Sequence, residues 1–227
     1  MRLTKSLICN SPYLGVNSIC TDDFCLVPHN ILPKEEKIIS GFVNTKIIKM
    51  EINQSPLIGV YLKCVKNKVV VGEDSIHPKE LEILEKEGIK VKLIKDYNAL
   101  GNLLAINSKY GIASPLLSKE SVKEISKFFN VPVVAQTCVG LDLPGSSLYV
   151  NDNFFLVNPN IKKEEFNEYT KKFGVVGKAT TLNYGDSFVG NDLISNKYSI
   201  IVGSLTSNIE LMKVDEIALE FEGEFTL

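Results

Sequence analysis

Five glycines recur along the chain at an almost constant interval: Gly15, Gly59, Gly101, Gly145 and Gly190. Their separations are 44, 42, 44 and 45 residues. Thirteen residues after each glycine stands a residue suited to end a strand, in order Pro28, Gly72, Ser114, Asn158 and Gly203. A period held this closely over 227 residues predicts one supersecondary unit repeated five times. We expect the glycines to sit in turns, where glycine adopts a positive φ without strain.

The third copy shows the pattern of the unit. The apolar run 103–106 is followed by the polar turn 107–109 and a second run, 111–113, which together predict a β-hairpin. A helix follows, capped by Ser118, with Val122, Ile125 and Phe129 at helical spacing. Another strand, 131–136, completes a ββαβ-type unit.

The other copies repeat these signals. Hairpin turns are expected at 21–23, 65–67, 151–153 and 196–198, and strands after the helices at 46–52, 90–94 and 175–181. In the second copy Pro78 suits the first helical position and Gly88 the end of the helix. In the fifth, Ser207 followed by Glu210 is a capping-box pattern. The first copy is the weakest, with a helix expected only over 34–39.

The fifth copy has no clear strand after its helix, whereas the segment 3–9 has no helix before it. We expect this N-terminal strand to complete the fifth unit and close the ring, because units of about forty residues bury their apolar faces only against neighbours. The predicted fold is a closed five-bladed α/β propeller. It forms a single domain, 1–227, with repeats at about 10–52, 53–96, 97–139, 140–183 and 184–220, and with 3–9 as the closing strand.

The charge, the apolar runs and the cysteines of the chain argue against several classes of function. The net charge is −2 and Arg2 is the only arginine, so the basic excess typical of nucleic-acid binding is missing. No apolar run reaches the roughly 18 residues of a membrane span, and the N-terminus does not read as a secretory signal. We expect a cytoplasmic protein without membrane contact. The odd number of cysteines, without a CxxC pair, argues for thiols packed as small core residues.

The sequence contains no recognisable catalytic motif. Its two histidines, His29 and His77, read as a turn residue and a helix-capping residue. Paired cysteines for zinc, an HExxH motif and a phosphate-binding P-loop are all missing from the sequence. The acidic pairs 35–36 and 164–165 lie at helix starts, where carboxylates interact favourably with the helix dipole. We predict a protein that is not an enzyme and uses no cofactor or metal.

Three segments point to a known family. The turn Ala-Leu-Gly-Asn at 99–102, the loop Tyr-Gly-Asp-Ser-Phe-Val-Gly at 184–190 and Leu-Val-Asn-Pro at 156–159 accompany the five-unit period. Together they resemble the translation initiation factor 6 family of archaea and eukaryotes over residues 3–215. The short chain is similar to the archaeal form. This resemblance implies the closed ring known as the pentein fold.

The resemblance also implies a function. Members of the family bind the large ribosomal subunit at its intersubunit face, beside a ribosomal protein and near the sarcin–ricin loop. There they sterically prevent association with the small subunit, with roles in translation initiation and in large-subunit biogenesis. Release is linked to an elongation-factor-like GTPase and a ribosome-maturation cofactor. We expect a monomer.

Candidate ribosome-binding residues follow from the matched turn and from the repeat. Asn102 occupies the asparagine position of the family's docking turn, beside Gly101. The residues after the other four glycines should rim the same face, with Lys66 of the second hairpin as a further contact; these four are Val16, Val60, Ser146 and Asn191. Lys66 and Tyr184 stand where family members often carry arginine, whose planar fork lysine does not reproduce.

Two other functions remain as alternatives. One is a guanidine-modifying enzyme of the same fold, similar to arginine deiminases and amidinotransferases, for which Cys138 would be the candidate nucleophile. The other is a basic RNA-binding module, which the net charge disfavours.

Overall fold

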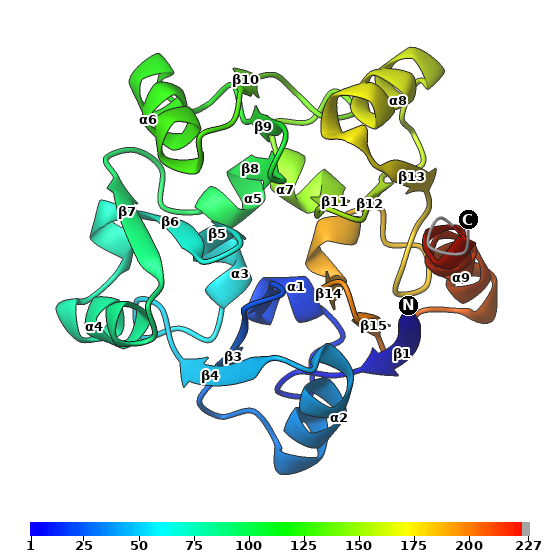
Figure 1. The fold of residues 1–227 in the computed structure, drawn as a ribbon, viewed down its shortest axis with the longest axis horizontal. Coiled ribbons are helices and arrows are strands. Elements are labelled where there is room, and N and C mark those ends of the chain that lie inside the picture. The colour runs from blue at the N-terminus through cyan, green and yellow to red at the C-terminus, as the bar shows by residue number, and fades with distance from the viewer. Residues whose placement is uncertain (224–227) are drawn as a thin grey trace.

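The computed structural model describes residues 1–223, which form five three-stranded sheets around a central axis (Figure 1). In each sheet the inner strand runs antiparallel to the middle strand, and the outer strand runs parallel to it. The first sheet, or blade, contains β2 (Ile19–Cys20), β3 (Phe24–Pro28) and β4 (Lys46–Met50). The second contains β5 (Leu62–Val65), β6 (Lys68–Gly72) and β7 (Lys90–Ile94). The third contains β8 (Leu104–Ile106), β9 (Gly111–Ala113) and β10 (Val133–Ala135). The fourth contains β11 (Leu148–Val150), β12 (Phe154–Val157) and β13 (Val176–Ala179), and the fifth β14 (Leu193–Ser195), β15 (Ser199–Gly203) and β1 (Arg2–Ser6).

The ring is closed by the two ends of the chain, as predicted. β1 pairs in parallel with β15, with Thr4 opposite Ile201, and so takes the place that an outer strand holds in the other four sheets. The blade built from residues 193–203 therefore depends on a strand from the opposite terminus. This pairing covers the flank that a linear array of repeats would leave exposed.

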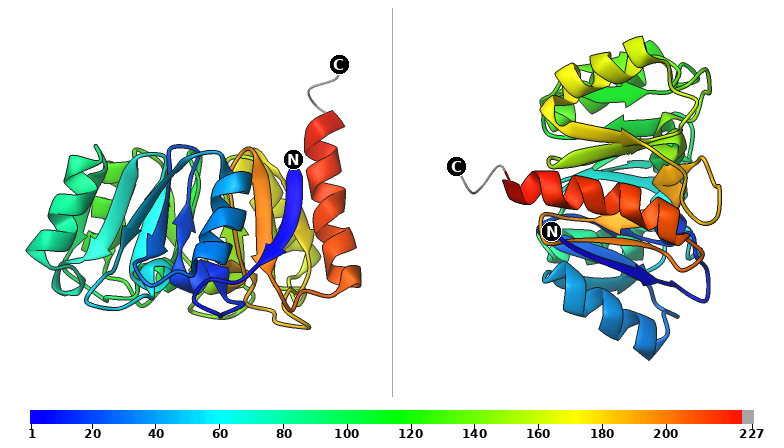
Figure 2. Two further views of the ribbon diagram at one scale, coloured as in Figure 1. Left: turned by 90° about the horizontal axis from the view of Figure 1, so that it is seen from below. Right: turned by 90° about the vertical axis from the view of Figure 1, so that its right-hand side faces the viewer.

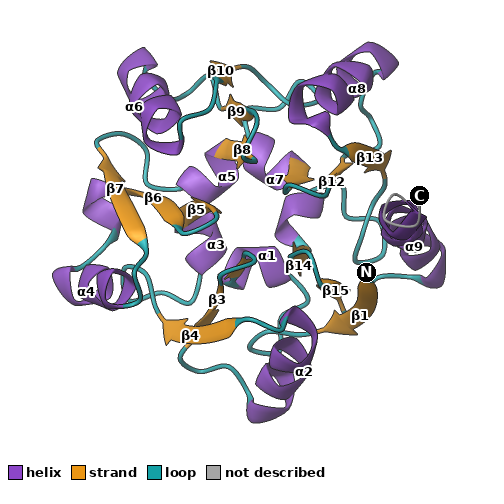
Figure 3. Cartoon of the chain, in the orientation of Figure 1, coloured by secondary structure: helices purple, strands orange, loops and turns teal. Residues whose placement is uncertain are grey.

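Each blade carries one outer helix and one short inner helix (Figure 3). The outer helices are α2 (Pro33–Val43), α4 (Pro78–Lys86), α6 (Lys119–Phe129), α8 (Lys163–Tyr169), continued by η2 (Thr170–Gly174), and α9 (Asn208–Gly223). The inner ones are α1 (Leu14–Asn17), α3 (Ile58–Tyr61), α5 (Leu100–Leu103), α7 (Pro144–Ser147) and η3 (Val189–Asn191). A further turn, η1 (Glu73–Ser75), precedes α4.

The helix signals of the second, third and fifth copies are confirmed. The Ser118 hydroxyl accepts from the Ser121 amide at 3.1 Å, and Gly88 has φ +74° just after α4. In the first blade the helix is longer than predicted: Pro33 occupies its first turn, and Asn44 ends it in the left-handed conformation. Asparagine tolerates this conformation and ends the helix as glycine commonly does. The exact bounds of the repeats stay a prediction.

The prediction of positive φ at the five periodic glycines is wrong. Each lies in an inner helix, and none has φ in the left-handed region. Glycine is needed here because the inner helices nearly touch. A Cβ on Gly59 would lie 1.8 Å from the Gly15 carbonyl oxygen, and one on Gly101 would lie 1.8 Å from that of Gly59. The pattern continues through Gly145 and Gly190 back to Gly15, so five backbones pack in a closed ring.

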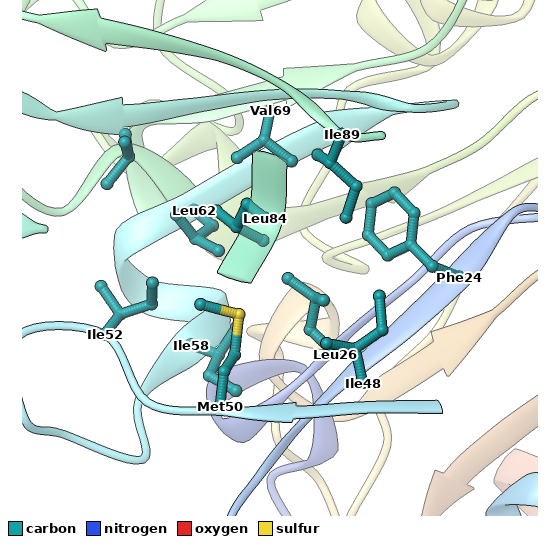
Figure 4. Close-up of a cluster of buried hydrophobic side chains, with 11 residues drawn as sticks. Phe24, Leu26, Ile48, Met50, Ile52, Ile58, Leu62, Val69, Leu84 and Ile89 are labelled. Atoms are coloured by element: carbon teal, nitrogen blue, oxygen red, sulfur yellow. The ribbon is translucent and has the colours of Figure 1, made fainter. Parts of the chain in front are cut away.

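The hydrophobic core is divided among the five interfaces between adjacent blades. Along β3, Leu26 packs toward the second blade, whereas Cys25 and Val27 pack toward the fifth. Figure 4 shows the cluster between the first two blades, where Met50 lies among side chains of both. Because the middle strands are buried on both faces, they read as continuous apolar runs rather than as alternating patterns.

The ring has two different ends (Figure 2). Every inner strand begins at an inner helix and leads to a hairpin turn, so the inner helices gather at one end of the axis and the hairpin turns at the other. We call these the glycine end and the hairpin end.

Candidate functional site

Loops at the glycine end are held by carboxylates from the outer helices. Glu35 of α2 accepts from the amides of Cys9 and Asn10, at 2.8 and 3.0 Å. Both of these residues have positive φ, which aligns consecutive amides toward one acceptor. Glu35 also accepts from the Leu32 amide, so one side chain caps its own helix and fixes the loop.

The same device recurs in three more blades. Glu80 binds the amides of Asn53 and Gln54, Glu165 binds that of Val139, and Glu210 binds those of Tyr184 and Gly185. Each acid stands 20 or 21 residues after a periodic glycine. The sequence shows this spacing, but the helix dipole alone does not explain these acids. Their second role, binding the backbone amides of a loop, becomes visible only in the structure. In the third blade Ser121 takes the equivalent place.

Burial and hydrogen bonding act against each other on Glu210. Burial alone would raise its pKa, but donors from Ser207, Thr181 and Gly185 stabilise the carboxylate, and the net pKa is lowered. The loop that Glu210 fixes carries Tyr184, which is 84% exposed. A rigid backbone therefore presents an exposed aromatic ring.

Apolar side chains are exposed at the glycine end. Tyr13, Leu57 and Leu143 occupy the same position in their units, immediately before an inner helix, and are 42%, 36% and 37% exposed. Tyr97 and Tyr184 lie in the loops that lead into the inner helices α5 and η3, and both are also exposed. Exposed apolar groups gathered at one end of a compact ring are typical of a protein-binding surface.

The predicted site residues divide into two groups. Val16, Val60, Asn102, Ser146 and Asn191 all lie on the inner helices at the glycine end or directly at their C-termini. Asn102 and Asn191 are half-buried and line the central cavity together with Gly101. Ser146 is only 2% exposed.

Lys66 is separated from that group. It lies in the turn between β5 and β6, at the hairpin end, with φ +53°. The physical reason is the direction of the inner strand, which carries the chain from α3 to the opposite end of the ring. The structure therefore does not bring Lys66 together with Val60 on one face.

A cavity with about 110 Å³ of space for water-sized molecules runs along the axis. The five glycines and the inner strands line it, and the hairpin residues Asp22, Lys66, Asn107 and Asp152 border it. Several hairpins are linked around its mouth: the Ser108 amide donates to Asp152 at 2.8 Å, and the Lys197 amide donates to Asp22 at 2.8 Å. Among the described residues, the turn 65–67 makes no hydrogen bond to a neighbouring hairpin turn.

A buried acid lies in the fifth blade. Asp192 is fully buried, and one of its oxygens accepts from the Asn183 amide group at 2.7 Å, whereas the other has no hydrogen-bond partner in the described chain. Burial, with Asp186 nearby, raises the pKa of Asp192 to about 8. Asn183 also donates to the Pro12 carbonyl, which connects this loop to the first blade.

The candidate nucleophile of the alternative enzyme is poorly placed. Cys138 is fully buried between the third and fourth blades, away from the residues that line the axial cavity. Burial raises the pKa of its thiol to about 12, so the nucleophilic thiolate is disfavoured. Its neighbour Tyr169 donates to Glu165 at 2.6 Å, and this pairing fits the loop-fixing role of Glu165.

No helix within residues 1–223 has the length and apolar character needed to cross a bilayer.

The fold places the chain in a definite class. Five ββαβ blades closed by the N-terminal strand define an α/β propeller of the pentein kind. Comparison with protein families narrows this class, because the eIF-6 family matches residues 3–217. The chain belongs to the eIF-6 family.

Similar curated proteins carry the name translation initiation factor 6. That of Pyrococcus furiosus is 36% identical over 222 residues, which cover 95% of this chain and 98% of the relative. That of Aeropyrum pernix is 35% identical, covering 95% and 94%, and that of Methanococcoides burtonii is 33% identical, covering 92% and 95%. The family and these names support a role in translation initiation.

Proposed function

We propose that this protein binds the intersubunit face of the large ribosomal subunit with its glycine end and sterically prevents association with the small subunit. Membership of the eIF-6 family supports the ribosomal target. The observation that carries the choice of surface is the set of exposed apolar side chains at equivalent repeat positions, Tyr13, Leu57 and Leu143. They suit a ribosomal protein as the main partner, because apolar contact is the driving term of most protein–protein association.

The net charge of −2 fits this mode of binding. A protein that docked mainly on rRNA phosphates would need a concentration of basic side chains, and its affinity would fall steeply with salt. A location near the sarcin–ricin loop then places rRNA at the border of the interface rather than at its centre. Lys66, at the opposite end, would contact rRNA only if the subunit reached around the ring.

Rigidity supports a mechanism of steric occlusion. The inner helices pack backbone to backbone, and carboxylate contacts fix the loops in four blades. A rigid surface loses little conformational entropy on binding. The blocking action then needs no catalysis, and release is left to an external GTPase and a maturation cofactor. We further propose that the protein acts as a monomer in the cytoplasm, in translation initiation and in maturation of the large subunit.

Co-sedimentation with purified archaeal large subunits, followed by a subunit-joining assay, tests the proposal. We expect the wild-type protein to pellet with large subunits and to reduce the population of joined ribosomes. The double variant Leu57→Asp/Leu143→Asp should bind at least tenfold more weakly, because it places charges in an apolar interface. Asn102→Ala should cost about 1–3 kcal/mol of binding if its amide makes a central polar contact.

The matched control is Leu219→Asp. Leu219 is 60% exposed on α9, away from the glycine end, so the control adds one charge at an apolar surface position without touching the proposed interface. Equal loss of binding in Leu219→Asp and in the double variant would refute the choice of surface. Binding that leaves subunit joining unchanged would refute occlusion.

A further inference from the structure

One charged side chain lies where the repeat otherwise places uncharged ones. The fourth residue after each periodic glycine is, in order around the ring, Ile19, Lys63, Ala105, Tyr149 and Ile194. All five belong to the inner strands, and Lys63 of β5 lines the axial cavity. The neighbouring third blade carries alanine at this level, the smallest of the five side chains.

Within residues 1–223 the ammonium of Lys63 forms no hydrogen bond and no ion pair. Burial lowers the pKa of this amine from its ordinary value, because removal from water destabilises the charged form. Lys63 is half-buried, and a partly desolvated cation without a partner is unfavourable for folding. Lys63 therefore lines the cavity as a cation without a counter-charge.

The other polar groups along the cavity are largely engaged. Tyr149 and Asn151 bond to Ser195, and Asn107 donates to two backbone carbonyls. Asp22 and Asp152 lie at the mouth, where each accepts a backbone amide from the neighbouring hairpin.

Two further polar residues border the cavity near Lys63. Lys66 borders the cavity from the same blade, and Asn102 lines it from α5, which contacts β5. Within residues 1–223 no hydrogen bond joins the turn 65–67 to a neighbouring hairpin turn, which leaves a route of entry next to both lysines.

We propose that the axial cavity is a binding site for a small oxyanion, a phosphate or a carboxylate, with Lys63 as its central partner. Lys66 adds positive charge at the entrance. The volume of about 110 Å³ fits a small ion or the terminal group of a small metabolite rather than a polymer. A guanidinium substrate, by contrast, would meet Lys63 as a like charge.

The site is tested by NMR titration of the full chain labelled with ¹³C-lysine. The two ligands are inorganic phosphate and malonate, each added separately. The Lys63 signal is assigned by its loss in Lys63→Met. We expect saturable shifts of this signal with at least one anion, together with an upward shift of the Lys63 pKa. A response to phosphate alone identifies a phosphoryl ligand, and a response to malonate alone identifies a carboxylate ligand.

Calorimetry on the variants completes the test. Lys63→Met should weaken binding at least tenfold and should not lower the melting temperature, since an apolar side chain replaces an unpaired charge. Lys63→Gln serves the same purpose if the methionine variant does not fold. Lys197→Met is the matched control, because Lys197 is an exposed hairpin lysine outside the cavity lining and its loss should leave binding unchanged. Unshifted Lys63 signals with both anions, or wild-type affinity in Lys63→Met, would overturn the proposal.

Discussion

Replacing Gly59 with alanine gives the sharpest test of how the ring is held together. Gly59 lies in α3 with φ outside the left-handed region, so helix propensity alone predicts that alanine stabilises by about 0.5–1 kcal/mol. The packing predicts the opposite sign. The new Cβ would lie 1.8 Å from the Gly15 carbonyl oxygen and 2.9 Å from that of Ser18. Both neighbours are backbone atoms, so no side chain can rotate away.

The magnitude follows from this geometry. Inserting a methyl group into a packed interior costs typically 1–3 kcal/mol, and we expect about 3 kcal/mol because the obstacle is backbone. For a domain of this size that corresponds to a fall in melting temperature of roughly 6–12 °C. The measurement is thermal and urea unfolding followed by circular dichroism.

Gly41→Ala is the matched control. Gly41 lies in α2, is exposed, and a Cβ there would meet nothing within 4 Å. Without a clash only propensity acts, so Gly41→Ala should stabilise by about 0.5–1 kcal/mol. If Gly59→Ala proved as stable as wild type, or if the two variants shifted stability by the same amount, the argument from backbone packing would be refuted.

Two further predictions concern pH and the loop of the fifth blade. The pKa of Glu210 is lowered on folding, so its contribution to stability is present above the unfolded pKa and is lost as the pH falls through the folded value. Glu210→Gln should therefore lower the free energy of unfolding by about 1–3 kcal/mol at pH 7. A loss of the same size at pH 2 would contradict this cause. The pKa of Asp192 is raised to about 8, so the folded state binds the extra proton and stability should decline from about pH 4 to about pH 8. Asp192→Asn should remove this decline in urea unfolding measured across that range, and an identical pH profile in wild type and variant would show that Asp192 does not titrate on folding.

The sequence by itself determined the repeat, the order of elements and the closing of the ring. Its period fixed five equivalent units, the hairpin turns were located correctly, and the unmatched segment 3–9 indicated which strand completes the fifth blade. These features are local or periodic, so composition and spacing are enough to predict them. The docking turn around Asn102 could be matched by resemblance, but its contacts stay a prediction.

Only the tertiary structure decided what the periodic glycines do and which candidate residues share a surface. Their role depends on close contact with carbonyl oxygens of residues more than forty positions away in the sequence. No local sequence pattern encodes such a contact. The same holds for Lys66, which the strand direction carries to the hairpin end, and for Lys63, whose isolation becomes visible only when five inner strands enclose one axis. Spacing along the chain gives the repeat, whereas the closure of the ring decides which of its residues meet.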